Sequence, residues 1–349
     1  MSTSEAEAEQ EAVRVLRNAW QTIEPRLHAC VDELHAPFPK YAGYHFGWCD
    51  ATGEPANSRA GKAVRPALTL LACELVGGNR DAAVDAAAAV ELVHNFSLIH
   101  DDVMDGDTER RNRRTVWSVF GIPVAILVGD ALLTASQKVL IESEHPAAVP
   151  ALPLLNRAVQ RMLRGQMLDI RFESTPVVGL DACLSMVESK TAALLECACA
   201  LGALYGGADG TTTRAVHGLG HHLGIAFQCV DDLLGIWGDP RRTGKPVWSD
   251  LRSRKKSLPV VAALSGDTPA GWELSRLYSG EDPLTDDQLA RAADLVVNAG
   301  GRGWVQAAAQ HHYDEALSCL RSIRPVKGAA SEAKLALSAI AYLIVNRDV

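Results

Sequence analysis

The chain has 349 residues, of which 48% are hydrophobic, 22% charged and 5% aromatic, and its formal net charge at pH 7 is −8. This composition is ordinary for a globular protein with a sizeable core. The acidic balance argues against nucleic-acid binding, which usually requires a basic patch or stripe. Because alanine and leucine are abundant and aromatic residues are few, the composition favours helices over strands.

The eight cysteines form no CxxC pair, and Cys197 and Cys199 lie in an apolar stretch that favours buried free thiols. We therefore expect a reducing compartment, the cytoplasm. Residues 1–11 are polar and acidic and lack the basic start and apolar stretch of a signal peptide. No run of about 18 apolar residues occurs, so we expect no transmembrane segment.

Helical periodicity dominates the chain. After a tail at 1–11 that we expect to be disordered, the pattern predicts a helix over 12–34 and then a long loop at 37–55, marked by proline and glycine. No strand alternation or hairpin turn signal interrupts the helices that follow. The simplest interpretation is one all-helical domain spanning 12–349. Its further helices are predicted at 68–76, 81–104, 116–143, 150–174, 180–206, 211–235 and from 286 onward.

One apolar helix pattern runs directly into a group of acids, Asp101, Asp102 and Asp105. On a helix, Asp101 and Asp105 lie four residues apart and share a face. Two like charges one turn apart repel each other unless a hard cation such as Mg²⁺ lies between them. The alternative is a solvated acidic helix end, but the apolar residues that precede the acids argue against an exposed surface.

A second apolar stretch ends in another pair of acids, Asp231 and Asp232, 130 residues after the first pair. Two such segments in one chain make coincidence a poor explanation. We therefore predict that both segments bind Mg²⁺, whose preferred ligands are oxygens from carboxylates, water and substrate phosphates.

Basic residues accompany both acidic segments. Arginine binds diphosphate through its planar fork, and lysine binds it as a point charge. Each residue alone is a weak signal, because most lysines and arginines are solvated surface residues. Together with two Mg²⁺-type segments they predict sites for two diphosphates. These residues are Lys62, Arg65, Arg110, Arg111, Lys190, Lys245, Lys255 and Lys256.

The order and spacing of these segments resemble those of the trans-type polyprenyl synthetase family, and within it the geranylgeranyl and farnesyl diphosphate synthases. The resemblance covers roughly 61–264 and is weak in the flanks. It rests on a GKxxRP segment at 61–66, the DDxxD at 101–105 with its arginine pair, 166–169, Lys190-Thr191, an FQxxDD segment at 227–232, 243–245, and Asp250 followed by Lys255 and Lys256.

The resemblance implies a trans-prenyltransferase with an all-α isoprenoid synthase fold, helices around a deep central cavity, three Mg²⁺ ions and a homodimeric state. The residues implied to bind Mg²⁺ are Asp101, Asp102, Asp105, Asp231 and Asp232. Those implied to bind the allylic diphosphate are Arg110, Lys190, Thr191, Gln228, Lys245 and Lys255. Those implied to bind isopentenyl diphosphate are Gly61, Lys62, Arg65, His94 and Arg111. Four of the aspartates, Asp101, Asp102, Asp231 and Asp232, and two of the lysines, Lys190 and Lys245, are also expected to be catalytic.

Two departures from the family pattern stand out. Gly235 occupies the position where many relatives carry a third aspartate, which leaves open whether Asp239 contributes instead. The segment Arg113-Arg114-Thr115 differs from the Lys-Pro-Thr often found there, so the local loop geometry is open as well.

The expected reaction is head-to-tail condensation of isopentenyl diphosphate with an allylic diphosphate. Metal and cations stabilise the departing diphosphate, where negative charge develops. A class I terpene cyclase is the main alternative, but it needs only one diphosphate site and would leave Lys62, Arg65, His94 and Arg111 without a role. A non-catalytic partner subunit is a second alternative, although such a subunit would be expected to have lost an aspartate pair.

Product length is predicted from the helix that precedes Asp101. Residues one turn before the metals form the floor of the substrate pocket in this family. Here the two candidates are Phe96, which is bulky, and Ser97, which is small. This pattern resembles geranylgeranyl (C20) synthases more than farnesyl (C15) synthases, so we predict geranylgeranyl diphosphate, with farnesyl diphosphate as the alternative.

Overall fold

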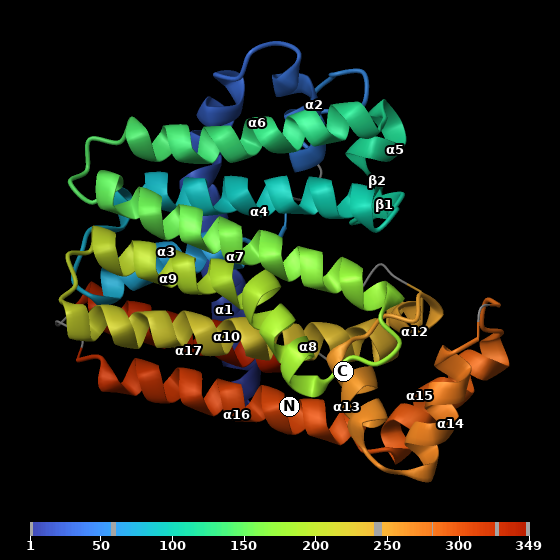
Figure 1. The fold of residues 1–349 in the computed structure, drawn as a ribbon. Coiled ribbons are helices and arrows are strands. Elements are labelled where there is room, and N and C mark those ends of the chain that lie inside the picture. The colour runs from blue at the N-terminus through green and yellow to red at the C-terminus, as the bar shows by residue number, and fades with distance from the viewer. Residues whose placement is uncertain (1–2, 57–60, 241–245, 281, 325–327, 347–349) are drawn as a thin grey trace. The chain divides into compact units, whose positions relative to one another are not determined.

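The structure is a computed structural model that describes residues 3–56, 61–240, 246–280, 282–324 and 328–346. Most of these residues lie in helices (Figure 1). Within the described part of the chain, strands are limited to the pairs Glu109–Arg110 (β1) and Arg113–Arg114 (β2), apart from an isolated bridge between Cys49 and Pro55. The prediction of an all-α fold is confirmed.

The helices group into two compact units, each with its own packing. The first comprises Met1–Arg157, Cys197–His217 and Ser322–Ile340, and the second comprises Ala158–Glu196, Gly218–Arg321 and Ala341–Val349. Five helices contribute residues to both units: α7 (Ala148–Ser174), α9 (Ala193–Tyr205), α10 (Gly210–Trp237), α16 (Gly301–Ser322) and α17 (Ala329–Val345). A single domain over 12–349 therefore stays a prediction.

The first unit is built around α4 (Val84–Met104), which packs most extensively against α6 (Ile122–Ile141) and also contacts several other helices of the unit. A run of four alanines, 86–89, is entirely buried in α4, and these small helix-forming side chains allow close approach of neighbouring helices. The apolar core includes Ile23, Leu27, Leu68, Leu92, Ile99 and Leu132. The other elements of this unit are α1 (Thr3–Asp32), α2 (Phe38–Phe46), α3 (Val64–Leu75), η1 (Arg80–Ala83), α5 (Val116–Phe120) and α6 (Ile122–Ile141).

Two predictions for the N-terminal part of the chain were wrong. The expected disordered tail at 1–11 is helical from Thr3, because residues 5–11 are only Glu, Ala and Gln, which are strong helix formers. The expected loop at 37–55 contains α2. Its proline lies in the first turn and Gly47 ends it with a φ of 85°, so residues taken as loop signals mark helix boundaries instead.

A β-hairpin that the sequence analysis missed follows α4. β1 and β2 pair antiparallel, and the two residues between them, Arg111 and Asn112, have φ values of 54° and 59°. Positive φ at both central residues is the geometry of a tight hairpin turn. Arg-Asn lacks the glycine that usually signals this turn, which explains the missed prediction. The hairpin is tied to α2, where Arg113 Nη1 donates to Tyr44 O at 3.0 Å and Tyr44 Oη donates to Arg114 O at 2.8 Å.

The second unit contains two apolar clusters. One joins α10 to the π-helical turn η2 (Glu188–Ala192) and α13 (Leu258–Ser265), through residues that include Val187, Ala192, Ile225, Leu233 and Leu258. The other includes Ile236, Leu251, Val260, Leu274 and Leu289. The remaining elements are α8 (Leu180–Val187), α12 (Ser249–Arg252), α14 (Pro269–Tyr278), α15 (Asp286–Asn298) and α16 (Gly301–Ser322).

A buried carboxylate, Glu196, is paired within the second unit. Arg161 donates to both of its oxygens, and His221 Nδ1 lies 2.8 Å from Oε1. The hydrogen bond to Glu196 raises the pKa of His221. A buried charge is costly unless it is paired and hydrogen-bonded, so these two donors are what makes Glu196 compatible with the core.

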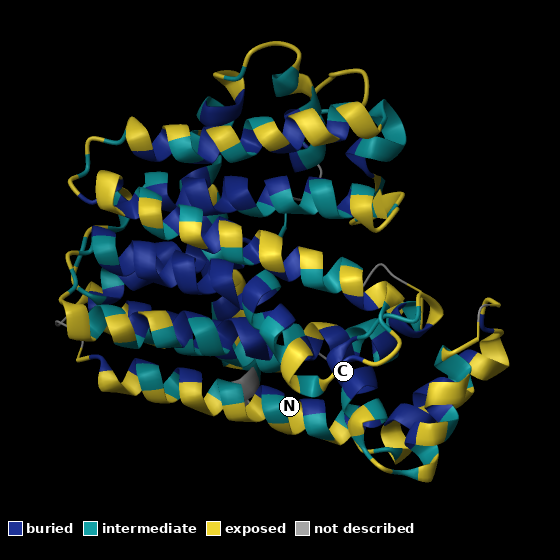
Figure 2. Ribbon diagram, viewed as in Figure 1, coloured by how far each residue is buried: buried dark blue, intermediate teal, exposed yellow. Residues whose placement is uncertain are grey.

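Two helical stretches in the described chain, Arg80–Met104 and Ile122–Ile141, are long and apolar enough to cross a bilayer. The apolar window of the first is 67% buried inside the structure, which is typical of the core helix of a globular protein. The second, α6, is 44% buried, and exposed residues recur along it (Figure 2). Its exposed apolar side chains are Ile122, Ile126, Leu127 and Ile141.

Candidate active site

The carboxyl end of α4 carries Asp101, Asp102 and Asp105. Asp105 is the residue that caps the helix and is exposed, whereas Asp101 is half-buried and Asp102 is buried. The last turn of a helix has a negative electrostatic potential, so acids are unfavourable there and cations are favourable. The end of α4 is therefore suited to a bound cation.

Asp102 anchors the hairpin. Arg110 Nε donates to Asp102 Oδ1 at 2.6 Å, and the Asp102 side chain is only 2% exposed. Burial raises the pKa of Asp102 to about 6, and the charge of Arg110 opposes this rise. The second aspartate of the pair is thus used to hold Arg110, while Asp101 and Asp105 lie on the more accessible face.

Mg²⁺ fits the donor set at these acids. All the candidate donors are carboxylate oxygens, which a hard cation prefers. In the described ranges no group of three or more His, Cys, Asp or Glu side chains forms a complete metal site. Mg²⁺ does not need one, because it is commonly held by one or two carboxylates together with substrate phosphates and waters.

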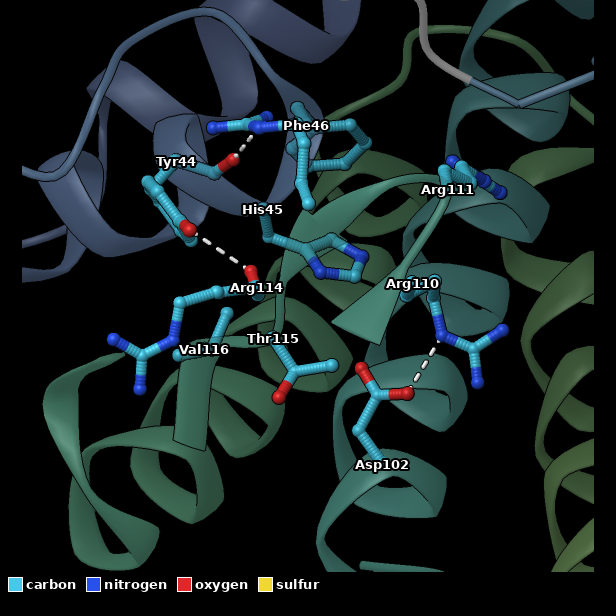
Figure 3. A pocket seen from close by; sticks show the side chains of 10 residues that line it. Tyr44, His45, Phe46, Asp102, Arg110, Arg111, Arg114, Thr115 and Val116 are labelled. Carbon is cyan, nitrogen blue, oxygen red and sulfur yellow. Dashed lines mark hydrogen bonds and ion pairs between the residues drawn. The ribbon is translucent and has the colours of Figure 1, made fainter. Parts of the chain in front are cut away.

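A pocket in the first unit is lined by the four arginines of the hairpin (Figure 3). In the close-up, His45 from α2 lies beside the hairpin, and the dashed line from Arg110 ends on Asp102. The guanidinium of Arg113 lies 4.5 Å from the centre of the Tyr44 ring. The pocket is lined by Tyr44, His45, Phe46, Asp102, Arg110, Arg111, Arg113, Arg114, Thr115 and Val116.

Arg111 lies over Gly61, at the entrance to α3. A Cβ atom added to Gly61 would lie 2.5 Å from Arg111 Nη2 and 3.0 Å from Cζ. Arg65, on the first turn of α3, donates from Nη1 to His94 Nε2 at 3.2 Å. The structure thus brings together Gly61, Arg65, His94 and Arg111, four of the five residues implied to bind isopentenyl diphosphate. The fifth, Lys62, is exposed.

The histidines next to these arginines are neutral. Burial, followed by the charges of Arg65 and Arg111, holds the pKa of His94 well below its usual value. Burial, followed by the charges of Arg111 and Arg110, lowers the pKa of His45 to about 3. Neutral histidines add no charge, so the positive potential of the arginines is left for an anionic ligand.

The acid that faces these arginines is Glu91, which the sequence analysis did not single out. It is buried on α4, its Oε1 accepts from Asn95 Nδ2 at 3.0 Å, and Asn95 Oδ1 in turn accepts from His45 Nε2 at 3.0 Å. Burial raises the pKa of Glu91, and the charge of Arg65 opposes that rise. In the sequence, Glu91 and Asn95 are polar residues four positions apart in an otherwise apolar helix, and this pattern could have identified them as a buried hydrogen-bonded pair.

In the second unit, α10 carries Asp231 and Asp232 with opposite exposures. Asp231 is exposed, and Asp232 is buried with both oxygens hydrogen-bonded. Gln228 Nε2 donates to Asp232 Oδ1 at 2.7 Å, and Leu258 N donates to Oδ2 at 2.8 Å. Burial nevertheless raises the pKa of Asp232 to about 7, and the charge of Lys255 opposes this. As at Asp102, the buried carboxylate is fixed and its neighbour is accessible.

Lys255 lies among carboxylates of the same unit. Burial lowers its pKa, but the acids outweigh burial and raise the pKa above its ordinary value. The contributing acids are Asp250, Asp232, Asp169 and Asp231, in that order. Lys255 is thus a firmly charged ammonium beside the Asp231–Asp232 pair.

The π-helical turn positions Lys190 and Thr191. Lys190 Nζ donates to Asp169 Oδ2 at 2.6 Å, and Thr191 Oγ1 donates to Gln228 Oε1 at 2.6 Å. A Cβ at Gly165 of α7 would lie 2.2 Å from Lys190 N, so only glycine allows this close approach of the two backbones. π-helical turns inside α-helices are frequent at functional sites.

Three residues of the predicted site remain: Lys245, Phe96 and Ser97. Lys245 lies outside the described residues. Phe96 is buried, and its ring packs edge-on against His100 at 4.9 Å between centroids. Ser97 is half-buried and donates from Oγ to His94 O at 2.8 Å. The structure therefore assigns Phe96 a packing contact within α4, while the role of both residues in product length stays a prediction.

The chain matches the family model for polyprenyl synthetase over residues 47–296. It is 43% identical over 337 residues to a (2E,6E)-farnesyl diphosphate synthase of Mycobacterium tuberculosis, covering 96% of this chain and 93% of that protein. It is also 45% identical over 307 residues to a geranylgeranyl diphosphate synthase of the same organism, covering 88% of each.

A solved structure is similar over nearly the whole chain. The crystal structure of a polyprenyl synthetase from Streptomyces coelicolor A3(2) has 44% sequence identity and a TM-score of 0.90, covering 95% of this chain and 99% of that one. These similarities extend beyond the 61–264 region on which the sequence resemblance rested, into both flanks.

Replacing Gly61 with alanine tests the cluster around Arg111. The added methyl group occupies the place of the Arg111 guanidinium, which is the mobile end of a long side chain and can move away. We expect the dissociation constant for isopentenyl diphosphate, measured calorimetrically without Mg²⁺, to rise about tenfold, as for loss of one charge-assisted hydrogen bond. The melting temperature should change by less than about 2 °C.

Gly303→Ala is the matched control, because a Cβ at Gly303 has no atom within 4 Å. Its affinity for isopentenyl diphosphate should equal that of the unchanged protein. If the affinity of Gly61→Ala for isopentenyl diphosphate is also unchanged, Arg111 does not bind this substrate.

Proposed function

The chain belongs to the polyprenyl synthetase family and is a trans-prenyltransferase, and we propose that it condenses isopentenyl diphosphate head-to-tail with an allylic diphosphate and releases diphosphate. The observation that carries this proposal is the cluster of Gly61, Arg65, His94 and Arg111. A terpene cyclase binds a single diphosphate, for which the lysines of the second unit would be enough. The arginine cluster of the first unit would then have no ligand.

We assign the isopentenyl diphosphate to the arginine cluster. Arg65 and Arg111 supply planar guanidinium donors suited to diphosphate oxygens. Gly61 leaves room for the Arg111 side chain, and neutral His94 accepts from Arg65 and holds it in place. Lys62 is exposed next to them and adds a point charge.

We assign the allylic diphosphate to the lysines of the second unit. Lys190 is held by Asp169, and Lys255 is kept charged by the surrounding acids. Thr191 and Gln228 form a hydrogen-bonded chain that ends on Asp232, so they orient the buried carboxylate. Lys245 is a further proposed ligand from the resemblance alone.

The accessible aspartates are the proposed metal ligands: Asp101 and Asp105 on α4, and Asp231 on α10. The buried aspartates, Asp102 and Asp232, hold the hairpin and the α10 end in place. The family uses divalent metal, and three Mg²⁺ ions are the number that the resemblance implies. Bound Mg²⁺ would neutralise the negative charge that develops on the leaving diphosphate.

The bond changes require no protein nucleophile. The bond between C1 of the allylic substrate and its diphosphate oxygen breaks, and the electron pair leaves with the diphosphate. The double bond of isopentenyl diphosphate then forms the new carbon–carbon bond at C1, and a proton is lost to the departing diphosphate. The lysines and arginines contribute by fixing both diphosphates and stabilising developing charge.

The proposed product is geranylgeranyl diphosphate. Ser97 is small and lies one turn before Asp101, which leaves room for a long prenyl tail. Phe96 is engaged with the His100 ring, and that ring fills the space over Gly129 of α6. Farnesyl diphosphate is the competing product, since relatives with either activity are of similar identity.

We also propose a homodimer formed through α6. Ile122, Leu127 and Ile141 are 48%, 54% and 63% exposed, so this apolar helix has an uncovered apolar face. A second copy of the chain would bury the same face on each partner, as in symmetric dimers. Eight free cysteines support the cytoplasm as the compartment.

Asp101→Asn should lower turnover by at least about 10²- to 10³-fold, because it weakens a metal ligand where catalysis is mainly electrostatic. Steady-state assays at saturating Mg²⁺ measure the effect, with thermal melting as the check on folding. Asp32→Asn, an exposed aspartate at the end of α1, is the control and should keep full activity. Near-normal turnover in Asp101→Asn would contradict the metal assignment.

Ser97→Phe should shift the product from C20 toward C15, because a large side chain one turn below the metal-binding acids closes the pocket. Chromatography of dephosphorylated products measures the shift. Ser97→Ala loses only the hydrogen bond to His94 O and should give the same products as the unchanged enzyme. If Ser97→Phe is fully active with unchanged products, this helix does not set product length.

Ile126→Glu should convert a dimer into a monomer in light-scattering measurements, since two buried carboxylates would face each other at a symmetric interface. Leu335→Glu changes an exposed leucine of α17 in the same way and should leave the assembly intact. A monomeric unchanged protein, or a dimeric Ile126→Glu variant, would contradict an interface on α6.

A further inference from the structure

The position of the missing third aspartate is not empty. Gly235 lies one helical turn after Asp231 on α10, so a side chain there would share the Asp231 face. A Cβ atom added to Gly235 would lie 2.4 Å from Asp250 Oδ2, 2.5 Å from its Cγ and 2.7 Å from its Oδ1. The carboxylate of Asp250 therefore fills the space that an aspartate side chain at 235 would occupy.

The segment that carries Asp250 is pinned to the end of α10. Trp248, in the left-handed region with a φ of 62°, donates from N to Ile236 O at 3.3 Å. Ser249 Oγ donates to Gly235 O at 3.1 Å and lies 3.4 Å from Asp250 Oδ1. Asp250 follows on α12 and is buried. Its carboxylate is thus placed by contacts of the two preceding residues, Trp248 and Ser249, with the backbone carbonyls of Ile236 and Gly235 on α10.

Asp250 also acts on Lys255. Its charge interacts with that lysine more strongly than the charges of Asp232, Asp169 and Asp231 do. Lys255 N donates to Asp250 O at 2.8 Å, so the backbone fixes the two residues relative to each other. Asp239, the other candidate in the sequence, comes after the end of α10 at Trp237.

We infer that Asp250 supplies, from α12, the third carboxylate that α10 lacks at position 235, as a positioning residue for Lys255 and an acidic partner of Asp231 toward divalent metal. Gly235 is then required because the carboxylate of Asp250 leaves no room for a side chain. This inference rests on the proposed function, since it concerns the acids and lysine that we assign to Mg²⁺ and the allylic diphosphate.

The test moves the carboxylate from one backbone position to the other. Asp250→Gly removes it, Gly235→Asp places a second one in the same space, and Gly235→Asp/Asp250→Gly restores one carboxylate on α10. The matched control, Gly235→Asn/Asp250→Gly, has the same shape without the charge. For each folded variant, binding of Mn²⁺ in the presence of inorganic diphosphate is measured by electron paramagnetic resonance, and turnover is measured in parallel with Mg²⁺.

Each single variant should weaken Mn²⁺ binding by about tenfold or more, as for loss of a charge-assisted contact. The transplanted variant should return to within about threefold of the unchanged protein, and the asparagine control should not. Equal recovery in the asparagine control would reduce Asp250 to a packing role, and a folded transplant without recovery would overturn the inference. Failure of the unchanged protein to condense the two diphosphates would instead overturn the proposed function, whatever the Mn²⁺ results.

Discussion

Burying one carboxylate of each aspartate pair is the constraint on which the candidate site depends. Such burial costs several kcal/mol unless charge and hydrogen bonds compensate. Asp102 is compensated by the guanidinium of Arg110, and Asp232 by Gln228, the backbone of Leu258 and the nearby charge of Lys255. These contacts fix the buried aspartate of each pair in place. The accessible aspartate is its neighbour on the same helix, so its direction is fixed as well. Preorganised carboxylates bind a metal without having to be ordered at the moment of binding.

In the arginine cluster, burial limits which side chains carry a charge. Positive charge accumulates around Arg65 and Arg111, and burial keeps His45 and His94 from adding to it. The charge of Glu91 partly balances that of the arginines, and Glu91 is itself oriented by Asn95. A bound substrate diphosphate would add further compensation for the charge of the arginines. Grouping these positive charges lowers the stability of the free protein but raises its affinity for a diphosphate. Such a loss of stability is common at functional sites.

Sequence reasoning succeeded for features that repeat along the chain and failed where distant segments meet. The long helices follow from apolar periodicity, and the acids and bases of the site follow from their order and spacing. In contrast, the helix at Phe38–Phe46 was taken for a loop because its proline and glycine mark ends rather than interruptions. The hairpin at Arg111 and Asn112 lacked the usual glycine. No pattern in the sequence places Asp250 on Gly235 or His45 on Asn95, because both contacts depend on tertiary packing.

The hairpin after α4 gives two adjacent arginines different partners. Arg110, at the end of β1, is held by Asp102, while Arg111, the first residue of the turn, lies over Gly61. The turn begins at Arg111, whose φ is 54°, so its side chain leaves the backbone in a different direction from that of Arg110 in the strand. Adding or deleting one residue here would change the register of the strand pair and exchange the faces of its side chains. In an evolving lineage, the length of this loop should therefore be far less free to change than its individual residues.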